Sequence, residues 1–416
     1  MSVYKIIGGE HLHGSVKISG AKNAALKIIA ASIMADSPST IHDVPRILDI
    51  IKLEEIIEQA GAKINVDGNT VVIDPSSINT TKLDHDLVKQ LRGSIVLAGP
   101  MLSRFHQVEF AQPGGCLIGA RPIDTHLHLF SQFGIKLVEG GDSYTLKGKP
   151  VSGDITLNEL SVTATENAIM ASVLSPGTTT IYAGACEPEI ENLIDFLNNM
   201  GAKIKTYFGH KIEIEGVEKL HGTEHRIIPD RIEAGTYILA ALATNSEIEV
   251  TNINPEHLKH VLNRIKNSGA DISVSANSLS TKKHSGLKSV DIDTRTYPGF
   301  PTDLQSQYAV FSATTTGSTR IFETIFESRF GYIEEIKKMG ADISVESPHI
   351  VYVHGPVTLQ GTEIDALDIR GGAALVMAGL IANGTTTING AELIKRGYED
   401  MAGKLQKLGA NIEEID

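Results

Sequence analysis

Cysteine is nearly absent from this chain of 416 residues, which contains only Cys116 and Cys186. Two thiols cannot form the disulfide network that holds small secreted domains together, so the fold must depend on a buried apolar core. Such a low cysteine content is typical of proteins that fold in a reducing compartment. We therefore expect a cytoplasmic protein.

Long apolar runs and an excess of basic residues are also missing. No segment reaches the roughly 18 apolar residues that span a bilayer, and the start, MSVYKIIGGEHLHG, lacks the pattern of a secretory signal. Lys and Arg number 37 against 50 Asp and Glu, a net charge of −13. General nucleic-acid and anionic-membrane binders need a net basic face. We expect neither as a partner, and the sequence indicates no obligate protein partner.

The composition that is present is that of a folded protein. Apolar residues make up 41% and charged residues 21% of the chain, which excludes extended disorder. The length suggests about two to four domains. No HExxH, CxxC or GxxxxGK[ST] motif occurs, so the sequence has no phosphate-binding P-loop. The pairs His11 and His13, and His126 and His128, lack a third ligand nearby, and we expect no metal site.

A short glycine signature recurs along the whole chain, as GAKI, GIKL, GADI or GANI. Its glycines are Gly61, Gly134, Gly201, Gly269, Gly340 and Gly409, separated by 73, 67, 68, 71 and 69 residues. Each follows a stretch with apolar residues at three- and four-residue steps, which predicts a helix. A glycine after the last turn can adopt positive φ and end the helix, and strand-like residues follow it. The chain is therefore predicted to contain six modules of helix, strand, helix and strand.

Module two is longer than the others. From the strand after the first helix to the glycine stop, five modules need 19 to 21 residues, whereas Val108 to Gly134 spans 26. The additional residues fall in AQPGGCLIGARPID, which contains Cys116. A module-specific loop on a repeated scaffold is where function is usually found.

The last module lacks a strand, because the chain ends soon after its NIEEI segment. Two strand-like segments at the N-terminus, VYKIIGG and GSVKISG, precede the first predicted helix and belong to no module. We expect them to pack with the C-terminal half. The predicted domains are residues 22–229, with three modules and the Cys116 loop, and residues 1–21 with 230–416, with the other three.

Polar or charged residues mark the start of the first helix in each module. Four of these residues are cations, Lys22, Arg92, Arg231 and Arg370. Helix N-termini offer free N–H groups and a partial positive charge, so parallel modules would gather an anion-binding face. The alternative, that each cation only caps a surface helix, stays open for any one of them.

Several motifs together resemble the UDP-N-acetylglucosamine 1-carboxyvinyltransferase family. They are SGAKNAAL, LRGSIVLAGPMLSRF, PGGCLIGARPIDTH, EPEIENLIDFLNNMGAKI, PDRIEAGTY, FPTDLQSQ, ETIFESRF and RGYED, in family order over essentially the whole chain. The resemblance implies an α/β fold made from an α+β repeat, the two-lobed inside-out α/β barrel of six modules found in enolpyruvyl transferases. It also implies that no cofactor or metal is needed.

The resemblance implies two small-molecule substrates, phosphoenolpyruvate and UDP-N-acetylglucosamine. The enolpyruvyl group moves to the sugar 3-hydroxyl by addition and elimination, with release of phosphate, in peptidoglycan precursor synthesis. By motif, Cys116 is the general acid and the target of fosfomycin-type epoxides, and Asp303 is the base. Lys22, Arg121 and Arg396 resemble ligands of the phosphate group, and Arg329 and Arg370 resemble partners of the carboxylate.

The remaining substrate-binding positions surround the nucleotide sugar. They are Asn23, Arg92, Arg121, Pro122, Ile123, Asp124, Thr125, Ser161, Val162, Arg231, Asp303 and Ile325.

Three positions depart from the family pattern. Leu393 stands where the family often has His, Thr163 where Gly allows close approach to the diphosphate, and Glu159 where some members have Lys. Two alternatives therefore remain. One is an enolpyruvyl transferase acting on a different nucleotide or a shikimate-type acceptor, and the other is a non-catalytic UDP-sugar-binding paralogue.

Overall fold

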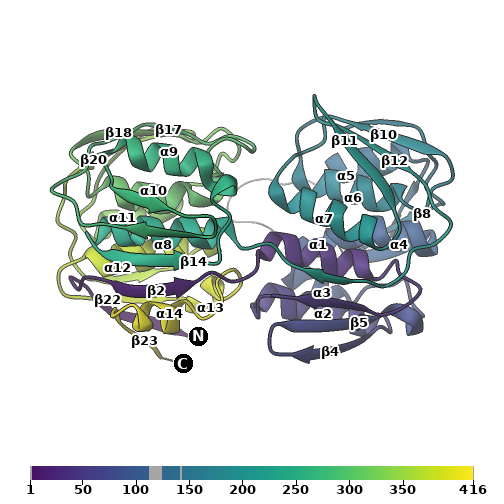
Figure 1. Cartoon of the computed structure of the whole chain (residues 1–416), viewed down its shortest axis with the longest axis horizontal. Helices are drawn as coiled ribbons and strands as arrows, with labels where there is room; N and C mark the ends of the chain where they lie inside the picture. The colour runs from purple at the N-terminus through teal and green to yellow at the C-terminus, as the bar shows by residue number, and fades with distance from the viewer. Residues whose placement is uncertain (1, 112–123, 141–142, 416) are drawn as a thin grey trace. The chain divides into compact units, whose positions relative to one another are not determined.

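The computed structural model describes residues 2–111, 124–140 and 143–415. They divide into two compact units, one of residues 20–111 and 124–228 and the other of residues 2–19 and 229–415 (Figure 1). Each unit has its own hydrophobic core.

The unit of residues 20–228 repeats one arrangement of helices and strands three times. Its first helices are α1 (Lys22–Ser32), α4 (Ala98–Phe105) and α6 (Val162–Ser172), and its second helices are α2 (Leu48–Gln59), α5 (Asp124–Gln132) and α7 (Pro188–Asn199). Its strands are β3 (Ser39–His42), β4 (Lys63–Asp67), β5 (Thr70–Asp74), β6 (Gln107–Ala111), β7 (Lys136–Gly140), β8 (Ser143–Lys147), β9 (Asp154–Thr156), β10 (Thr178–Tyr182), β11 (Lys203–Tyr207), β12 (Lys211–Glu215) and β13 (Glu224–Arg226). Short helices η1 (Pro75–Ser77), α3 (His85–Gln90) and η2 (Arg92–Leu97) connect the first two modules.

The other unit uses the same arrangement. Its first helices are α8 (Arg231–Ala243), α10 (Gln305–Ser312) and α12 (Ile369–Ile381), and its second helices are α9 (Lys259–Asn267), α11 (Tyr332–Lys338) and α14 (Met401–Lys407). Its short helices are η3 (Pro255–Leu258), η4 (Thr302–Leu304) and α13 (Ala391–Ile394). Its strands are β1 (Val3–Ile7), β2 (His13–Lys17), β14 (Glu247–Thr251), β15 (Ile272–Val274), β16 (Ser278–Thr281), β17 (Ile292–Asp293), β18 (Gly317–Phe322), β19 (Asp342–Ser347), β20 (Ile350–Gly355), β21 (Glu363–Asp365), β22 (Thr385–Asn389) and β23 (Asn411–Ile415).

Within the described residues, the strands form six sheets, one for each glycine signature. Five have four strands in an equivalent order, as in β13-β3-β5-β4, where a parallel edge strand is followed by antiparallel pairs. The sheet of module two, β6-β8-β7, has three. A single parallel bridge between Lys82 and Glu109 lies where the others have an edge strand.

The N-terminal strands complete sheets of the C-terminal half. Strand β1 lies between β22 and β23 and pairs antiparallel with both. It supplies the strand that the sixth module lacks, as the sequence predicts. Strand β2 pairs in parallel with β14 and serves as the edge strand of the fourth module.

All six signature glycines end a helix in the predicted way. Their φ angles lie between 74° and 108°, a region that residues with a Cβ rarely adopt. After Gly61, for example, the N–H of Ala62 donates to the carbonyl of Ile57 at 3.2 Å, which satisfies an orphan carbonyl of the helix end. The backbone then turns directly into the next strand, so the glycine stop fixes where each hairpin begins.

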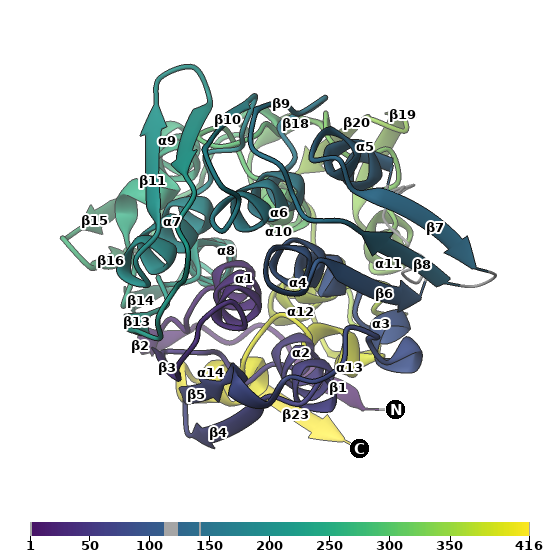
Figure 2. The ribbon, with the colours of Figure 1, turned by 90° about the vertical axis from the view of Figure 1, so that its right-hand side faces the viewer.

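The first helices of the modules form the centre of each unit, and the sheets lie outside them. Every residue from Ile232 to Leu242 in α8 and from Arg370 to Leu380 in α12 is buried. In the unit that faces the viewer of Figure 2, helices α1, α4 and α6 lie inside a ring of strands. The strands alternate buried and more exposed residues, as in β14, because one sheet face covers the helices and the other meets solvent. No helix among the described residues is long and apolar enough to cross a membrane.

One ion pair interrupts the apolar core of the unit of residues 20–228. Lys27 Nζ of α1 lies 3.4 Å from Glu166 Oε2 of α6, and both side chains are buried. Neither oxygen of Glu166 has a hydrogen-bond partner among the described residues. Burial raises the pKa of Glu166 to about 8, although Lys27 lowers it. Lys27 therefore offsets only part of the cost of burying this carboxylate.

We expect the stability that Glu166→Gln gains over the unmodified protein to increase as pH rises from about 5 to 9. The unfolded carboxyl releases its proton near 4.5 and the folded one near 8, so the native state loses stability as pH rises through this window. The amide mimics the protonated acid and removes that loss, which is about 5 kcal/mol at pH 9. Thermal unfolding at pH 5 and pH 9 measures the difference. Exposed Glu218 offers the control, Glu218→Gln, and an equal gain for Glu166→Gln at both pH values would contradict the prediction.

Candidate active site

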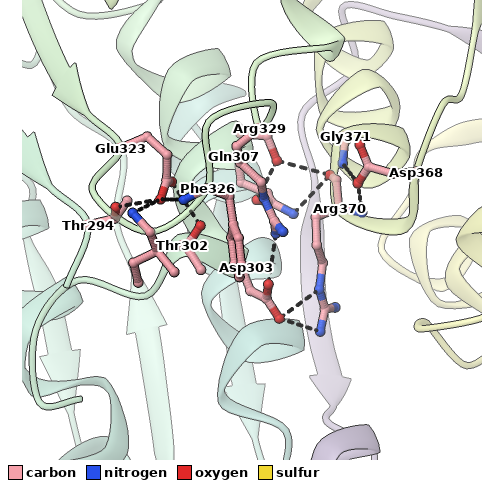
Figure 3. A network of polar contacts seen from close by, with 12 residues as sticks. Thr294, Thr302, Asp303, Gln307, Glu323, Phe326, Arg329, Asp368, Arg370 and Gly371 are labelled. Atoms are coloured by element: carbon pink, nitrogen blue, oxygen red, sulfur yellow. Dashed lines mark hydrogen bonds and ion pairs between the residues drawn. The ribbon is translucent and has the colours of Figure 1, made fainter. Parts of the chain in front are cut away.

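A carboxylate and two guanidinium groups meet in the unit of residues 229–415 (Figure 3). Asp303 Oδ1 accepts a hydrogen bond from Arg329 Nη2 at 2.7 Å, and Asp303 Oδ2 accepts from Nε and Nη2 of Arg370, both at 3.3 Å. Both arginines are buried, at 4% and 5% exposure. The structure thus brings together three residues that the sequence predicts to be functional.

Each member of this cluster is held where a helix begins or a turn ends. Asp303 lies in η4, directly before α10, and Arg329 lies in the turn between β18 and α11. Arg370 is in the first turn of α12, whose N-cap residue, Asp368, accepts from the N–H groups of Arg370 and Gly371. A Cβ at position 371 would lie 2.8 Å from the Asp368 carboxylate. Glycine there lets the cap close tightly on the helix.

Arg370 is a buried cation whose Nη1 has no acceptor among the described residues. Its guanidinium lies 5.2 Å from the ring centre of Tyr398, whose hydroxyl is bonded to Thr236 and Gln307. Burial lowers the pKa of Arg370, but Tyr398 and Asp303 outweigh burial and raise it overall. Because a buried donor without a partner is costly, Nη1 is suited to bind an anionic ligand.

Lys22 and Asn23 lie in the other unit, at the start of α1. Lys22 Nζ is 2.7 Å from Asp49 Oδ2 in the first turn of α2, and both side chains are buried. The sequence did not point to Asp49. Asn23 is half-buried beside Lys22. Lys22 is the cation that the glycine-flanked SGAKNAAL motif predicts at a helix start, and the structure places it there.

Two predicted nucleotide-sugar segments approach each other through Glu159. The hydroxyl of Thr125, in the first turn of α5, donates to Glu159 at 3.1 Å. The carbonyl of Glu159 accepts from the N–H of Ser161, whose side chain caps α6 at Ala164. Val162 is the first residue of α6, and Asp124, the first of α5, is exposed.

The other predicted residues lie on separate elements of the two units. Arg92 is the first residue of η2, and Arg231, the first of α8, lies over Tyr297 at 5.6 Å. Ile325 donates its N–H to Glu323, and Arg396 is half-buried between α13 and α14.

Four predicted site residues fall outside the described part of the chain. They are Cys116, Arg121, Pro122 and Ile123. Among residues 2–111, 124–140 and 143–415, no three His, Cys, Asp or Glu side chains are grouped to hold a metal ion.

The comparisons with known proteins define the class first. The model of the EPSP synthase (3-phosphoshikimate 1-carboxyvinyltransferase) family matches residues 6–405. A protein from Geobacillus kaustophilus, UDP-N-acetylglucosamine 1-carboxyvinyltransferase 2, is 43% identical over 99% of this chain and 96% of its own length. UDP-N-acetylglucosamine 1-carboxyvinyltransferase from Halothermothrix orenii is 41% identical over the full length of both chains. The chain therefore belongs to the EPSP synthase family and, within it, to the UDP-N-acetylglucosamine 1-carboxyvinyltransferases.

Solved structures show the same fold. The enolpyruvyl transferase NikO from Streptomyces tendae superposes with a TM-score of 0.89 at 27% identity, over 100% of this chain and 99% of that one. EPSP synthase from Acinetobacter baumannii gives a TM-score of 0.77 at 18% identity over the whole of both chains. The predicted enolpyruvyl transferase fold is confirmed.

We expect Asp303→Asn to weaken the fold and to make it respond to phosphate. The amide leaves two buried guanidinium groups without their carboxylate, a loss of about 2–4 kcal/mol. Phosphate should then raise the melting temperature of the variant more than that of the unmodified protein, because an anion can replace the lost charge. Thermal unfolding with and without phosphate measures both effects.

Asp293→Asn is the matched control. Asp293 also contacts two arginines, Arg320 at 2.9 Å and Arg295 at 3.3 Å, but these side chains are at least 36% exposed. Exposed pairs contribute less than about 1 kcal/mol. Equal responses of the two variants would show that the cluster at Asp303 has no special affinity for anions.

Proposed function

We infer that this protein transfers the enolpyruvyl group of phosphoenolpyruvate to the 3-hydroxyl of UDP-N-acetylglucosamine and releases phosphate. It thereby catalyses the first committed step of peptidoglycan precursor synthesis. The observation that carries this conclusion is the identity of 41–43% along the whole chain to relatives with that activity in their name. We further propose that it works in the cytoplasm, on these two small molecules and without a cofactor.

The addition step requires two proton transfers around one new bond. C3 of phosphoenolpyruvate takes a proton while C2 forms a bond to the sugar oxygen, whose own proton leaves. The tetrahedral intermediate then loses a proton from C3 and expels phosphate, which restores the double bond. An acid, a base and several cations are therefore needed around one carbon atom.

We propose that Asp303 is the base toward the sugar hydroxyl and Cys116 the acid toward C3. A carboxylate has the wrong sign to bind phosphate, so its place between two arginines favours a chemical role. The bonds from Arg329 to one oxygen and from Arg370 to the other fix the direction of the Asp303 carboxylate. A base held in one direction loses little entropy when it reacts.

The cations divide between the two ends of phosphoenolpyruvate in this proposal. Lys22, Arg121 and Arg396 bind its phosphate, and Arg329 and Arg370 bind its carboxylate. Support comes from the orphan Nη1 of Arg370 and from the position of Lys22 at a helix start. Around the nucleotide sugar we propose Asn23, Arg92, Asp124, Thr125, Ser161, Val162, Arg231 and Ile325, with Pro122 and Ile123.

A second candidate is the same transfer to a different nucleotide acceptor. It is favoured by Glu159, whose carboxylate is bonded to Thr125 beside the start of α6, where we propose that the diphosphate of the acceptor binds. Phosphate release from phosphoenolpyruvate, measured with UDP-N-acetylglucosamine, other UDP-sugars and shikimate 3-phosphate, separates the candidates. Turnover with UDP-N-acetylglucosamine at least tenfold above every other acceptor supports the first. No turnover with any acceptor would leave a binding protein.

We expect Asp303→Asn to separate binding from turnover. The amide preserves the shape of Asp303 but cannot take a proton, so affinity for the UDP-sugar should stay within about tenfold, or 1.4 kcal/mol, while most turnover is lost. Calorimetric titration and a phosphate-release assay give the two values. Unchanged turnover would exclude Asp303 as the base.

We expect fosfomycin to form one covalent adduct per chain, at Cys116. A thiol beside arginines gains thiolate character and nucleophilicity. Cys186 is the internal control, because partial burial and then Glu187 and Glu191 raise the pKa of its thiol. Cys116→Asp keeps a proton donor without sulfur and should retain some activity and resist the inhibitor. Peptide mass mapping that finds the adduct on Cys186 would show that the cysteine loop has another role.

A further inference from the structure

Glu323 is a buried carboxylate whose hydrogen bonds are all made inside the protein. It follows β18 and is fully buried. Its Oε1 accepts from the hydroxyl of Thr294 at 2.9 Å and from the N–H groups of Ile325 and Phe326 at 2.9 and 3.2 Å. Its Oε2 accepts from the hydroxyl of Thr302 at 2.8 Å.

These four donors belong to three separate segments of the chain (Figure 3). Thr302 lies in η4, next to Asp303, and Thr294 follows β17. Ile325 and Phe326 begin the turn that ends at Arg329, and the Phe326 ring lies 5.8 Å from the Arg329 guanidinium. One side chain thus ties the residue before Asp303 to the turn that carries its arginine partner.

The number of donors decides what Glu323 can do. An ionised carboxylate has about four acceptor sites, and Glu323 has four donors. Both of its oxygens are engaged inside the protein and the side chain is fully buried, so we do not assign it as a second acid or base. A buried charge is tolerated when it is fully hydrogen-bonded, and such a network is rigid.

We propose that Glu323 is a positioning residue that sets the geometry of Asp303 and Arg329 for the reaction. This inference rests on the proposed function, because it assigns a purpose to the cluster that the reaction would use. A carboxylate that must take a proton from a hydroxyl has to lie within hydrogen-bond reach in a defined direction. The bond from Thr302 fixes the backbone next to Asp303, and the bonds from Ile325 and Phe326 fix the turn before Arg329.

The decisive variants are Thr302→Val and its matched control, Thr294→Val. Both exchange a threonine hydroxyl for a methyl group and remove one hydrogen bond to Glu323. Only Thr302 is next to Asp303, and Thr294 also receives the N–H of Thr324, so the control is expected to be at least as destabilising. A positioning role predicts that Thr302→Val lowers kcat about tenfold with the KM for phosphoenolpyruvate within about twofold. Thr294→Val should keep kcat within about twofold.

Substitutions of Glu323 itself provide the rescue experiment. In Glu323→Gln, the amide oxygen can keep the three bonds of Oε1, and the amide nitrogen can donate to Thr302, whose hydroxyl then accepts. We expect kcat within about threefold of the unmodified enzyme. Glu323→Leu removes every acceptor and should lower kcat at least a hundredfold. Equal kcat losses in Thr302→Val and Thr294→Val, or a Gln variant as inactive as the Leu variant, would overturn the proposal.

A measurement without turnover keeps this inference separate from the proposed function. A double-mutant cycle of Asp303→Asn and Arg329→Met, followed by melting temperature, reports how strongly the two residues are coupled. We expect the coupling to fall by at least half in the Thr302→Val background and to persist in the Thr294→Val background. If no acceptor supports turnover, the proposed function fails while this cycle still tests Glu323. Unchanged coupling in both backgrounds would refute the positioning role.

Discussion

Burial of the first helix of each module on all sides is the constraint on which the rest of the structure depends. Residues 370–380 of α12 and 232–242 of α8 are all buried, so the middle of these helices cannot carry an unpaired charge. Charged groups are favoured at the helix ends, where the chain leaves the core, and Lys27 of α1 and Glu166 of α6 lie within the core as a pair. Lys22, Arg231 and Arg370 are all in the first turn of such a helix, where free N–H groups add to the positive field.

Two buried carboxylates show how the fold manages charge away from these ends. Glu323 receives four hydrogen bonds, whereas Glu166 receives none from the described residues and is paired with Lys27. Burial therefore raises the pKa of Glu166 to about 8. The four hydrogen bonds make Glu323 a rigid support. The rigid one lies beside the predicted chemistry, where geometry matters more than charge balance.

The sequence predicted the repeated architecture because its signals are local. A glycine with positive φ is required after each second helix, and the two strand-like segments near the N-terminus belong to no module of their own. Contacts between residues that are distant in the sequence have no local signal of this kind. Asp49 beside Lys22, Tyr398 beside Arg370 and Glu323 beside Thr302 depend on how modules pack. One feature of the sequence could have identified Glu323: a carboxylate directly after a core strand must find hydrogen-bond donors within the protein. Strand β13 pairs with β3 of module one, and the sequence did not predict which segment would form this edge strand.

The start of α6, where we propose that the acceptor binds, lacks a cation like those in the first turns of α1, α8 and α12. The start of α6 has a serine cap, as expected for a site that offers N–H groups to an anion. Yet Glu159 lies two residues before that cap in the sequence, and its carboxylate is 3.1 Å from the Thr125 hydroxyl. A negative group there repels a diphosphate unless a cation lies between them or Glu159 turns away. The start of α1, with Lys22, and the start of α6 are therefore not electrostatically equivalent. This difference, more than the shared fold, is what can distinguish one nucleotide acceptor from another.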